Sequence, residues 1–401
     1  MSNKEIKLAI KDECTGCAAC IDSCPKSCIS IARDGLHYYP QINSDQCIAC
    51  QKCMMVCPSL HPLDCETVHN QKYYACWHKD LNVVKTSTSG GVGTVLAERA
   101  IDLGYYVAGA VLTSAGDVKH MLAKDKMEIL AFKGSKYVQS NSLGIYKECL
   151  VAIKEGRKIF FIGTPCQTEA IKRFIPNNLH KYLLTCSIIC HGVNSPYVWD
   201  DFRRSLESKH QSKILSYNFR SKSHGWQKKN GGPNLRVAYT LSSGVKVDEP
   251  SWCNLFHYWF GQHLILRASC LRCQYRTEGR HSDIVIGDFW NIDKVKQSMD
   301  TYNGVSVLIT ISPQGEKIVN ANPYLVSHLV DSKKTLAELK GLINKKNMET
   351  QDKELIILKN FEQEYCEKGF KYMSNKYPKP TVSDQIINKI KSLWISLKLK
   401  I

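Results

Sequence analysis

Two short cysteine runs constrain this chain of 401 residues more than any other feature of its sequence. Residues 14–25 read CTGCAACIDSCP and residues 47–58 read CIACQKCMMVCP, so the spacing C-x2-C-x2-C-x3-C-P occurs twice. Three thiolates on a tight turn can bind three corners of an iron–sulfur cubane, while the fourth cysteine, before proline, reaches a second cluster. The runs therefore predict two [4Fe-4S] clusters near the N-terminus.

This is the spacing of bacterial ferredoxins, and it assigns four cysteines to each cluster by crossed pairing. The sets are Cys14, Cys17, Cys20 and Cys57 for the first cluster, and Cys47, Cys50, Cys53 and Cys24 for the second. A pair of zinc sites is the alternative, but zinc frameworks use separated pairs of ligands. We expect Cys28, Cys65 and Cys76, which fall outside the pattern, to be small buried hydrophobic residues. Residues 1–68 are thus predicted to form a small ferredoxin-like domain.

Composition indicates the cellular compartment in which these cysteines act and the chemistry that they serve. The first residues of the sequence do not resemble a signal peptide, and no apolar stretch approaches the roughly 20 residues that span a bilayer. We therefore expect a cytoplasmic protein whose 19 cysteines serve metal or redox chemistry. The formal net charge is +17, but each four-iron cluster with its thiolates carries roughly −2. The excess of basic residues therefore does not require a nucleic-acid partner, and we predict none.

The middle of the chain alternates between helical and extended patterns. Apolar residues recur at helical spacing over 92–103, and YYVAGAVL (105–112) is typical of a strand. A second helix is predicted over 142–156 and a buried strand over 157–163. The segment TSTSGG (86–91) opens the first helix, so it is either a plain N-cap or a cradle for a nucleotide or flavin phosphate.

Cys166 lies just after the strand over 157–163, with Thr164 at a good N-cap position and Pro165 at the first helical position. Ligands of α/β sheets bind at such strand ends, and a helix N-terminus is expected to lower the pKa of the thiol. Four further cysteines follow, which are Cys186, Cys190, Cys270 and Cys273. Four thiolates brought together would select zinc or an iron–sulfur cluster. Alternatively, Cys166 is a core residue, or a nucleophile with His191 or Asp288 as its base.

Six motifs resemble the β-subunit family of coenzyme F420-reducing hydrogenases and dehydrogenases in order and approximate spacing. They are TSTSGG, KGSKYVQS, GTPCQTEAI, CHGVNSPYVW, SCLRCQYRTEGRHSDIVIGDFW and NGVSVLI. The similarity covers most of residues 10–310 and is greatest to the variant with a fused two-cluster ferredoxin module. It implies an α+β or α/β fold, with a mixed α/β flavin-binding catalytic domain over 70–310 after the ferredoxin-like module.

The resemblance also implies cofactors and the residues that bind them. It implies FAD, and a third [4Fe-4S] cluster held by Cys166, Cys190, Cys270 and Cys273, with Cys186 as a spare candidate. By motif matching, the flavin contacts are Ser89, Gly90, Gly91, Lys136, Tyr137 and Ser140. Asp283 and Asp288 would either orient a cofactor or serve as caps and turns.

The expected function is that of an iron–sulfur flavoprotein oxidoreductase, which passes electrons between a flavin-bound two-electron donor or acceptor and a protein partner. One alternative is a reductase acting on an organic substrate at the flavin, and another is a non-catalytic ferredoxin-like electron-transfer subunit. The substrate is open between a deazaflavin and another small molecule. No catalytic acid or base can be assigned, since His191, His224 and His281 have no partner visible in the sequence.

Residues 311–401 are predicted to be helical, with mixed charges around apolar stripes. The last segment, 381–401, is a basic amphipathic sequence that follows the proline-marked YPKP. Such a helix could lie on an anionic membrane at the inner face, dock on a partner or pack on its own domain.

Overall fold

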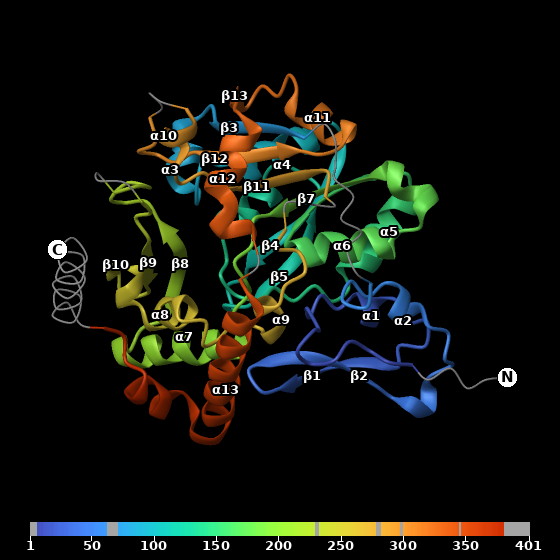
Figure 1. Ribbon diagram of the computed structural model, residues 1–401, viewed down its shortest axis with the longest axis vertical. Helices are drawn as coiled ribbons and strands as arrows, with labels where there is room; N and C mark the ends of the chain where they lie inside the picture. The colour runs from blue at the N-terminus through green and yellow to red at the C-terminus, as the bar shows by residue number, and fades with distance from the viewer. Residues whose placement is uncertain are drawn as a thin grey trace.

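The N-terminal module lies at one end of a body that contains a large mixed sheet (Figure 1). The long C-terminal helix α13 (Met348–Lys376), kinked at Gly369, runs along the module and contacts α7 (Pro196–His210) and α9 (Ala268–Leu271). This computed structural model describes residues 6–61, 71–228, 232–277, 282–296, 300–344 and 346–380. The predicted fold class is confirmed: a small ferredoxin-like region precedes a mixed α/β body and C-terminal helices.

The internal repeat of the module is visible in its backbone. The short helices α1 (Ala19–Asp22) and α2 (Lys52–Met55) each begin after a left-handed residue, Ala18 at φ 65° and Gln51 at φ 62°. These two residues occupy equivalent positions in the two cysteine runs. The other elements of the module are the antiparallel pair β1 (Ile29–Asp34) and β2 (His37–Ile42), and the 3-10 turn η1 (Ser44–Gln46). The two runs therefore fold in the same way.

Eight strands form the large sheet, in the spatial order β13-β3-β12-β11-β7-β6-β4-β5. The central strands β11, β7, β6 and β4 are parallel to one another, and antiparallel strands flank them on both sides. Their bounds are β3 (Lys72–His78), β4 (Tyr105–Leu112), β5 (Val118–Ala123), β6 (Lys158–Gly163), β7 (Leu183–Ile188), β11 (Ile284–Asp288), β12 (Ser306–Thr310) and β13 (Leu325–Leu329).

Helices cover both faces of this sheet because its strands alternate their side chains between two cores. Phe160 of β6 packs toward α4 (Val92–Asp102) and α11 (Pro313–Val319), whereas Phe161 packs toward α5 (Ile145–Lys154) and α6 (Pro165–Phe174). The helix α12 (Ser332–Ile343) covers β3 and β12. The predicted helix over 92–103 and both predicted strands are confirmed, and the helix predicted over 142–156 begins three residues late, at Ile145.

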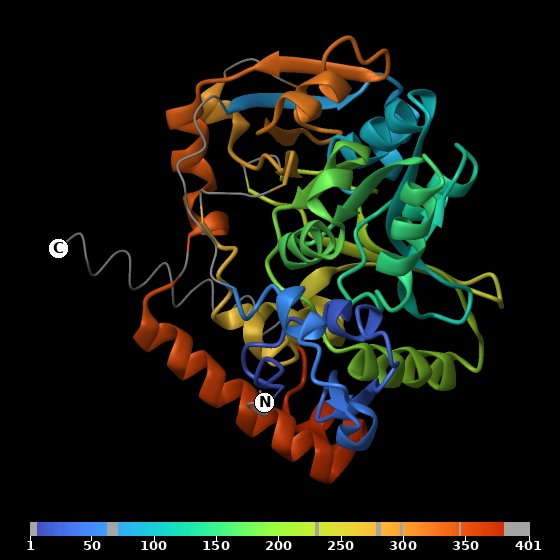
Figure 2. The same cartoon turned by 90° about the vertical axis from the view of Figure 1, so that its right-hand side faces the viewer.

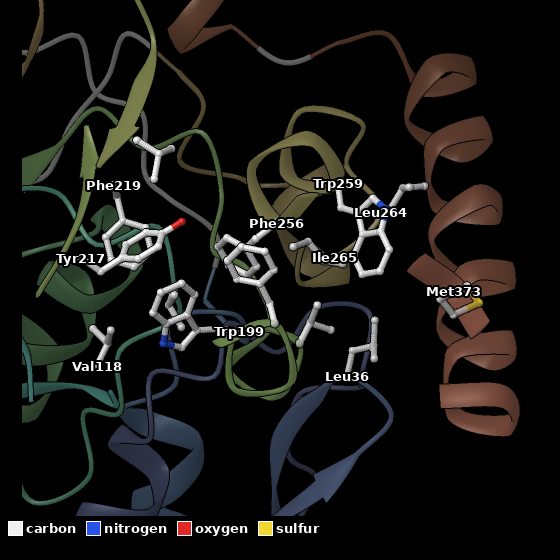
Figure 3. Close-up of a cluster of buried hydrophobic side chains, with 14 of the residues drawn as sticks. Leu36, Val118, Trp199, Tyr217, Phe219, Phe256, Trp259, Leu264, Ile265 and Met373 are labelled. Atoms are coloured by element: carbon white, nitrogen blue, oxygen red, sulfur yellow. The ribbon is translucent and has the colours of Figure 1, made fainter. Parts of the chain in front are cut away.

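A second core lies between a three-stranded antiparallel sheet and the helices around it (Figure 3). Trp199, Phe219, Phe256 and Trp259 fill it, and Leu36 enters from the turn between β1 and β2. The strands and helices are β8 (Ile214–Ser221), β9 (Arg236–Leu241), β10 (Lys246–Pro250), α7 (Pro196–His210) and α8 (Leu255–Gly261). The remaining short elements are α3 (Leu81–Thr86), η2 (Glu128–Phe132), η3 (Asn177–Tyr182), η4 (Ser251–Cys253), α9 (Ala268–Leu271) and α10 (Ile292–Val295).

Specific polar contacts hold the module against the rest of the chain. The Asp22 carboxylate accepts hydrogen bonds from the N–H groups of Gly144 (2.8 Å) and Tyr146 (3.2 Å), at the start of α5. On the other side, Glu362 of α13 accepts from the Leu36 N–H at 2.9 Å, and Figure 2 shows α13 passing along the module. The module is therefore fixed to two separate parts of the molecule.

The C-terminal region is helical as predicted, but it also supplies the edge strand β13, which the sequence analysis missed. The basic segment 381–401 lies outside the described residues, so its predicted membrane or partner contact stays a prediction. The predicted division at residues 68–70 and 310 also stays a prediction. Within the described ranges, no helix combines the length and the apolar character that crossing a membrane requires.

Candidate redox site

Three cavities are each lined by four of the cysteines that we predicted to act together. The first, of about 440 Å³, is enclosed by apolar residues that include Leu8, Ile21 and Tyr38. Its four cysteines are Cys14, Cys17, Cys20 and Cys57. The fold thus brings Cys57 from the second run to the three cysteines of the first run, as crossed pairing requires.

The second cavity, of about 310 Å³, contains Cys47, Cys50, Cys53 and Cys24. Cys50 is exposed to solvent. Cys28 lines this cavity too, and its sulfur lies 3.4 Å from that of Cys24. Cys28 is buried as expected, but it belongs to the cavity wall and not to a remote part of the core. Cys76 is buried in the sheet, and Cys65 lies outside the described residues.

The third cavity, of about 630 Å³, is lined by Cys166, Cys190, Cys270 and Cys273. These residues come from the first turn of α6, the segment after β7, and the region of α9. Cys186, the spare candidate, is fully buried within β7 and packs in the sheet core, apart from this cavity. The structure therefore groups the four cysteines implied by the motifs, while their role as ligands stays a prediction.

Local hydrogen bonds explain where Cys166 sits. Thr164 is the N-cap residue of α6. The Gln167 side-chain oxygen accepts a hydrogen bond from the Thr164 backbone N–H at 3.0 Å, so the two residues form a capping box. The Gln167 amide also donates to the hydroxyls of Ser140 (2.9 Å) and Ser142 (2.8 Å). These contacts fix the first turn of α6 against the loop that precedes α5.

The sequence analysis expected the helix N-terminus to lower the pKa of the Cys166 thiol, and this expectation is wrong. Burial raises the pKa of the Cys166 thiol, and the contact with the Thr164 hydroxyl lowers it less than burial raises it. The reason is that desolvation penalises an uncompensated thiolate more than the helix end stabilises it.

The nucleophile alternative for Cys166 gains no support from its proposed bases. His191 Nε2 lies 2.9 Å from His263 Nε2, and burial together with His263 lowers its pKa to about 4. Asp288 contacts Arg220 (3.4 Å) and the Trp226 indole N–H (3.3 Å). His224 is exposed beside Ser223, and His281 lies outside the described residues.

The zinc alternative stays a prediction. A closed zinc site needs four ligands within about 2.3 Å of one centre. In the described part of the chain, no group of three or more His, Cys, Asp or Glu side chains is arranged to hold a single metal ion. The cysteines instead surround cavities, an arrangement that suits a larger polynuclear group.

A fourth cavity, of about 1490 Å³, lies where β6, β7 and β11 end, the usual ligand position in sheets of this kind. Of the residues predicted to contact flavin, five line it: Ser89, Gly91, Lys136, Tyr137 and Ser140. Gly90 is not among the lining residues. Its N–H donates to the Ser306 hydroxyl at 3.0 Å, and a Cβ there would lie 2.5 Å from the Cys76 carbonyl oxygen. Gly90 therefore serves close packing behind the cavity wall.

The wall of this cavity suits an anionic ligand. Gly91, at φ 78°, caps α4, whose first-turn residues Val92 and Gly93 line the cavity, so the positive end of the helix dipole faces it. The Lys136 ammonium donates to the carbonyls of residues 131–133, and burial lowers its pKa to about 7. Lys136 therefore shapes the loop that closes this side of the cavity.

The four cavities follow one another through the molecule, and neighbouring cavities are joined by shared lining residues or by a short helix. Thr15 and Gly16 line both the first and the third cavity. Seven residues line both the third cavity and the large one: Ser140, Thr164, Gln167, Cys190, His191, Gly192 and Val193. Within the module, Cys20 of the first cavity and Cys24 of the second flank the end of α1. The order is therefore second, first, third and large cavity.

Comparison with known proteins identifies the family. The description "Coenzyme F420 hydrogenase/dehydrogenase, beta subunit N-term" matches residues 73–147, and the corresponding C-terminal description matches residues 156–328. The chain belongs to that family. Residues 13–60 match a 4Fe-4S dicluster domain, so this family member is an iron–sulfur protein related to oxidoreductases.

Two relatives of this family member are distant. An uncharacterized protein of Methanocaldococcus jannaschii is 24% identical over 212 residues, which are 44% of this chain and 57% of that protein. The chain therefore spans little more than half the length of this curated relative. A chain of the F420-reducing [NiFe] hydrogenase complex from Methanosarcina barkeri aligns with a TM-score of 0.40 and 15% identity, over 76% of this chain and 95% of that chain.

Sequence reasoning missed three cations in this member of the F420 hydrogenase/dehydrogenase beta-subunit family, of which Arg220 and Arg267 are buried and Lys222 is half-buried. Arg220 donates to the Tyr137 hydroxyl at 2.9 Å and pairs with Asp288 at the large cavity. Lys222 donates to the carbonyl oxygen of Ser89 at 2.7 Å and supports the segment 86–91. Arg267 lies between the module and the sheet domain. The only signal for Arg267 was its position three residues before Cys270.

The two aspartates of HSDIVIGDFW have different roles. Asp283 accepts from the backbone and hydroxyl of Thr185, at 2.8 and 2.7 Å, and from the Ser312 hydroxyl at 2.6 Å. It thus ties β7 to the start of α11, as expected of a capping residue. Asp288 lines the large cavity, which leaves a cofactor-orienting role open to it.

Proposed function

We propose that this protein is an iron–sulfur flavoprotein oxidoreductase that passes electrons between a flavin in the large cavity and a protein partner near the second cavity. The observation that carries this proposal is the unbroken order of cavities, in which each cysteine-lined cavity adjoins the next through shared residues or a shared helix. We propose [4Fe-4S] clusters in the three cysteine-lined cavities, with the cysteines named above as their ligands.

The chain's own residues would bind and orient these groups. The N-terminus of α4 and the surrounding Ser89, Gly91 and Ser140 fit the phosphates of FAD, while Arg220 holds Tyr137 against the cavity. When bound, FAD supplies exchange between a two-electron hydride step and single electrons for the clusters. Cys14 and Cys17 of the first cavity are buried, and the four cysteines of the third cavity are partly buried. The exposed Cys50 marks the second cavity as the point of contact with a partner.

A second candidate function rests on the lining of the large cavity. Its wall combines apolar residues such as Ile129 and Phe132 with polar residues such as Lys133 and Asp288, a mixture typical of small-molecule sites. In this function an organic substrate, a deazaflavin among them, would bind in the cavity beside the flavin. In that case the protein is a reductase that acts directly on the substrate. A non-catalytic electron-transfer subunit is the remaining alternative, and it would bind no flavin.

Metal and flavin analysis of one anaerobic preparation tests the proposal. The intact protein should contain about twelve irons, with matching sulfide, and one flavin. Cys166→Ser should lose about four irons. Cys186→Ser is the matched control because that cysteine is buried in β7 outside the third cavity, and it should retain the full iron content.

The possible results separate the alternatives. About eight irons in the intact protein, unchanged in Cys166→Ser, would confine the clusters to the module and overturn the third site. Full iron without flavin would favour the non-catalytic electron-transfer subunit. Full iron with flavin, and reduction of a small molecule without any protein partner, would favour the direct reductase.

A further inference from the structure

Arg267 is a fully buried arginine at the contact between the N-terminal module and the sheet domain. Its Nε donates to the Cys14 carbonyl oxygen at 2.5 Å, and Nη1 donates to Gln139 Oε1 at 3.0 Å. Nη2 donates to the Tyr38 carbonyl oxygen at 3.0 Å and lies 3.5 Å from the Cys14 sulfur. The guanidinium therefore touches a cysteine of the first cavity through both its backbone and its sulfur.

Within the part of the chain that the structure describes, the charge of Arg267 has no carboxylate paired with it. Among the ion pairs formed by the described residues, none joins Arg267 to Asp or Glu. The contacts above are to neutral acceptors, and the Tyr39 ring lies 4.2 Å from the guanidinium carbon. Burying an unpaired charge is costly, so buried cations normally have an anionic partner. The Cys14 sulfur, 3.5 Å from Nη2, is a group beside Arg267 that can become anionic.

The same short segment reaches two cysteine-lined cavities. Arg267 caps α9, and the Ser269 hydroxyl in that helix also donates to the Cys14 carbonyl oxygen, at 3.0 Å. Cys270, in the same helix, lines the third cavity. The close approach depends on Gly16, where a Cβ would lie 2.6 Å from Arg267 Nη1. Arg267 therefore stands between the first and third cavities.

We propose that Arg267 is the buried counter-charge of the first cluster and raises its reduction potential, a role that rests on the proposed function. The cluster with its four thiolates carries roughly −2 and gains a further electron on reduction. A fixed positive charge stabilises the more negative form, and a hydrogen bond to a ligand sulfur acts in the same direction. Arg267 acts through Cys14 and is thus a positioning and tuning residue.

A redox titration of the whole protein, followed by EPR, tests this role. Arg267→Met and Arg267→Gln remove the charge, whereas Arg267→Lys keeps it. Both neutral variants should shift the midpoint of the first cluster to more negative potential by at least 59 mV, a tenfold change for one electron. Arg267→Lys should shift it less. Cys17→Ser, which removes a ligand of the first cluster, identifies the wave that belongs to it.

Arg203→Met is the matched control. Arg203 is a half-buried arginine of α7 that pairs with Asp200 and Glu207 and lines none of the cysteine cavities. Its loss should leave every midpoint unchanged.

Each result bears on a different claim. An unshifted first wave in a neutral variant that retains its iron would overturn the role of Arg267 but leave the proposed function intact. Failure to find four irons in the first site of the intact protein would instead overturn the proposed function. If both neutral variants lose the first cluster, its retention in Arg267→Lys supports the counter-charge. Loss in all three variants would reduce Arg267 to a packing role.

Discussion

Gly16 shows how a single position holds the module against the rest of the molecule. Its φ of 67° favours glycine, and a Cβ would lie 2.2 Å from Gln139 Nε2. Gly16→Ala should cost about 1–2 kcal/mol from the left-handed backbone, and about 1–3 kcal/mol more from overpacking. Anaerobic denaturant unfolding, with iron content measured on the same sample, checks this loss of stability.

Gly104→Ala is the control for that substitution. Gly104 has a similar φ of 77°, but a Cβ there meets nothing within 4 Å. It should therefore show only the backbone cost of about 1–2 kcal/mol and keep its iron. Equal losses of unfolding free energy in Gly16→Ala and Gly104→Ala would contradict the close contact at Gly16.

At the scale of elements, α13 supports the short helix α9, which carries Cys270. Leu358 of α13 is buried and packs in one cluster with Leu266 and Leu271. Leu358→Ala should lower the free energy of unfolding by about 2–5 kcal/mol, because it leaves a cavity against α9. Iron in the third site should also become easier to remove by a chelator. The neighbouring Ile357 is 54% exposed, so Ile357→Ala should change stability by about 0.5 kcal/mol or less.

The elements also show what the sequence could and could not predict. The helix at 92–102, the strand at 158–163 and the capped start of α6 followed from periodicity and cap residues, since those signals are local. β13 did not, because its place in the sheet depends on pairing with β3, far away in the chain. The four cysteines of each module cavity followed from spacing, whereas Arg267, Arg220 and Lys222 are defined only by contacts between distant segments.

At the scale of the whole molecule, buried neutral histidines should make stability depend on pH. Burial lowers the pKa of His37 and of His257 to about 3, and that of His120 to about 4; in the unfolded chain the value is about 6.5. Below pH 6.5 the unfolded state therefore binds protons that the folded state does not. Stability is fully present above pH 6.5 and is lost as the pH falls toward 3–4.

His257→Gln isolates one of these groups. Between pH 7.5 and 5.5 a single such histidine removes about 1.4 kcal/mol of stability. The variant should lose that much less than the parent protein over this range, as measured by the denaturant midpoint at each pH. Between pH 7.5 and 8.5 the two proteins should change alike. An identical acid loss in both proteins would show that His257 is protonated in the folded state.

The wall formed by Thr15 and Gly16 determines how electrons would pass between the first and third clusters of the proposed function. Because the first and third cavities adjoin through this wall, no part of the chain has to swing between them. In the proposed function the path between these two clusters is therefore fixed by the fold. Of the twelve cysteines proposed as ligands, Cys50 alone is exposed, so collision with another protein would reach the chain of clusters most directly at that end.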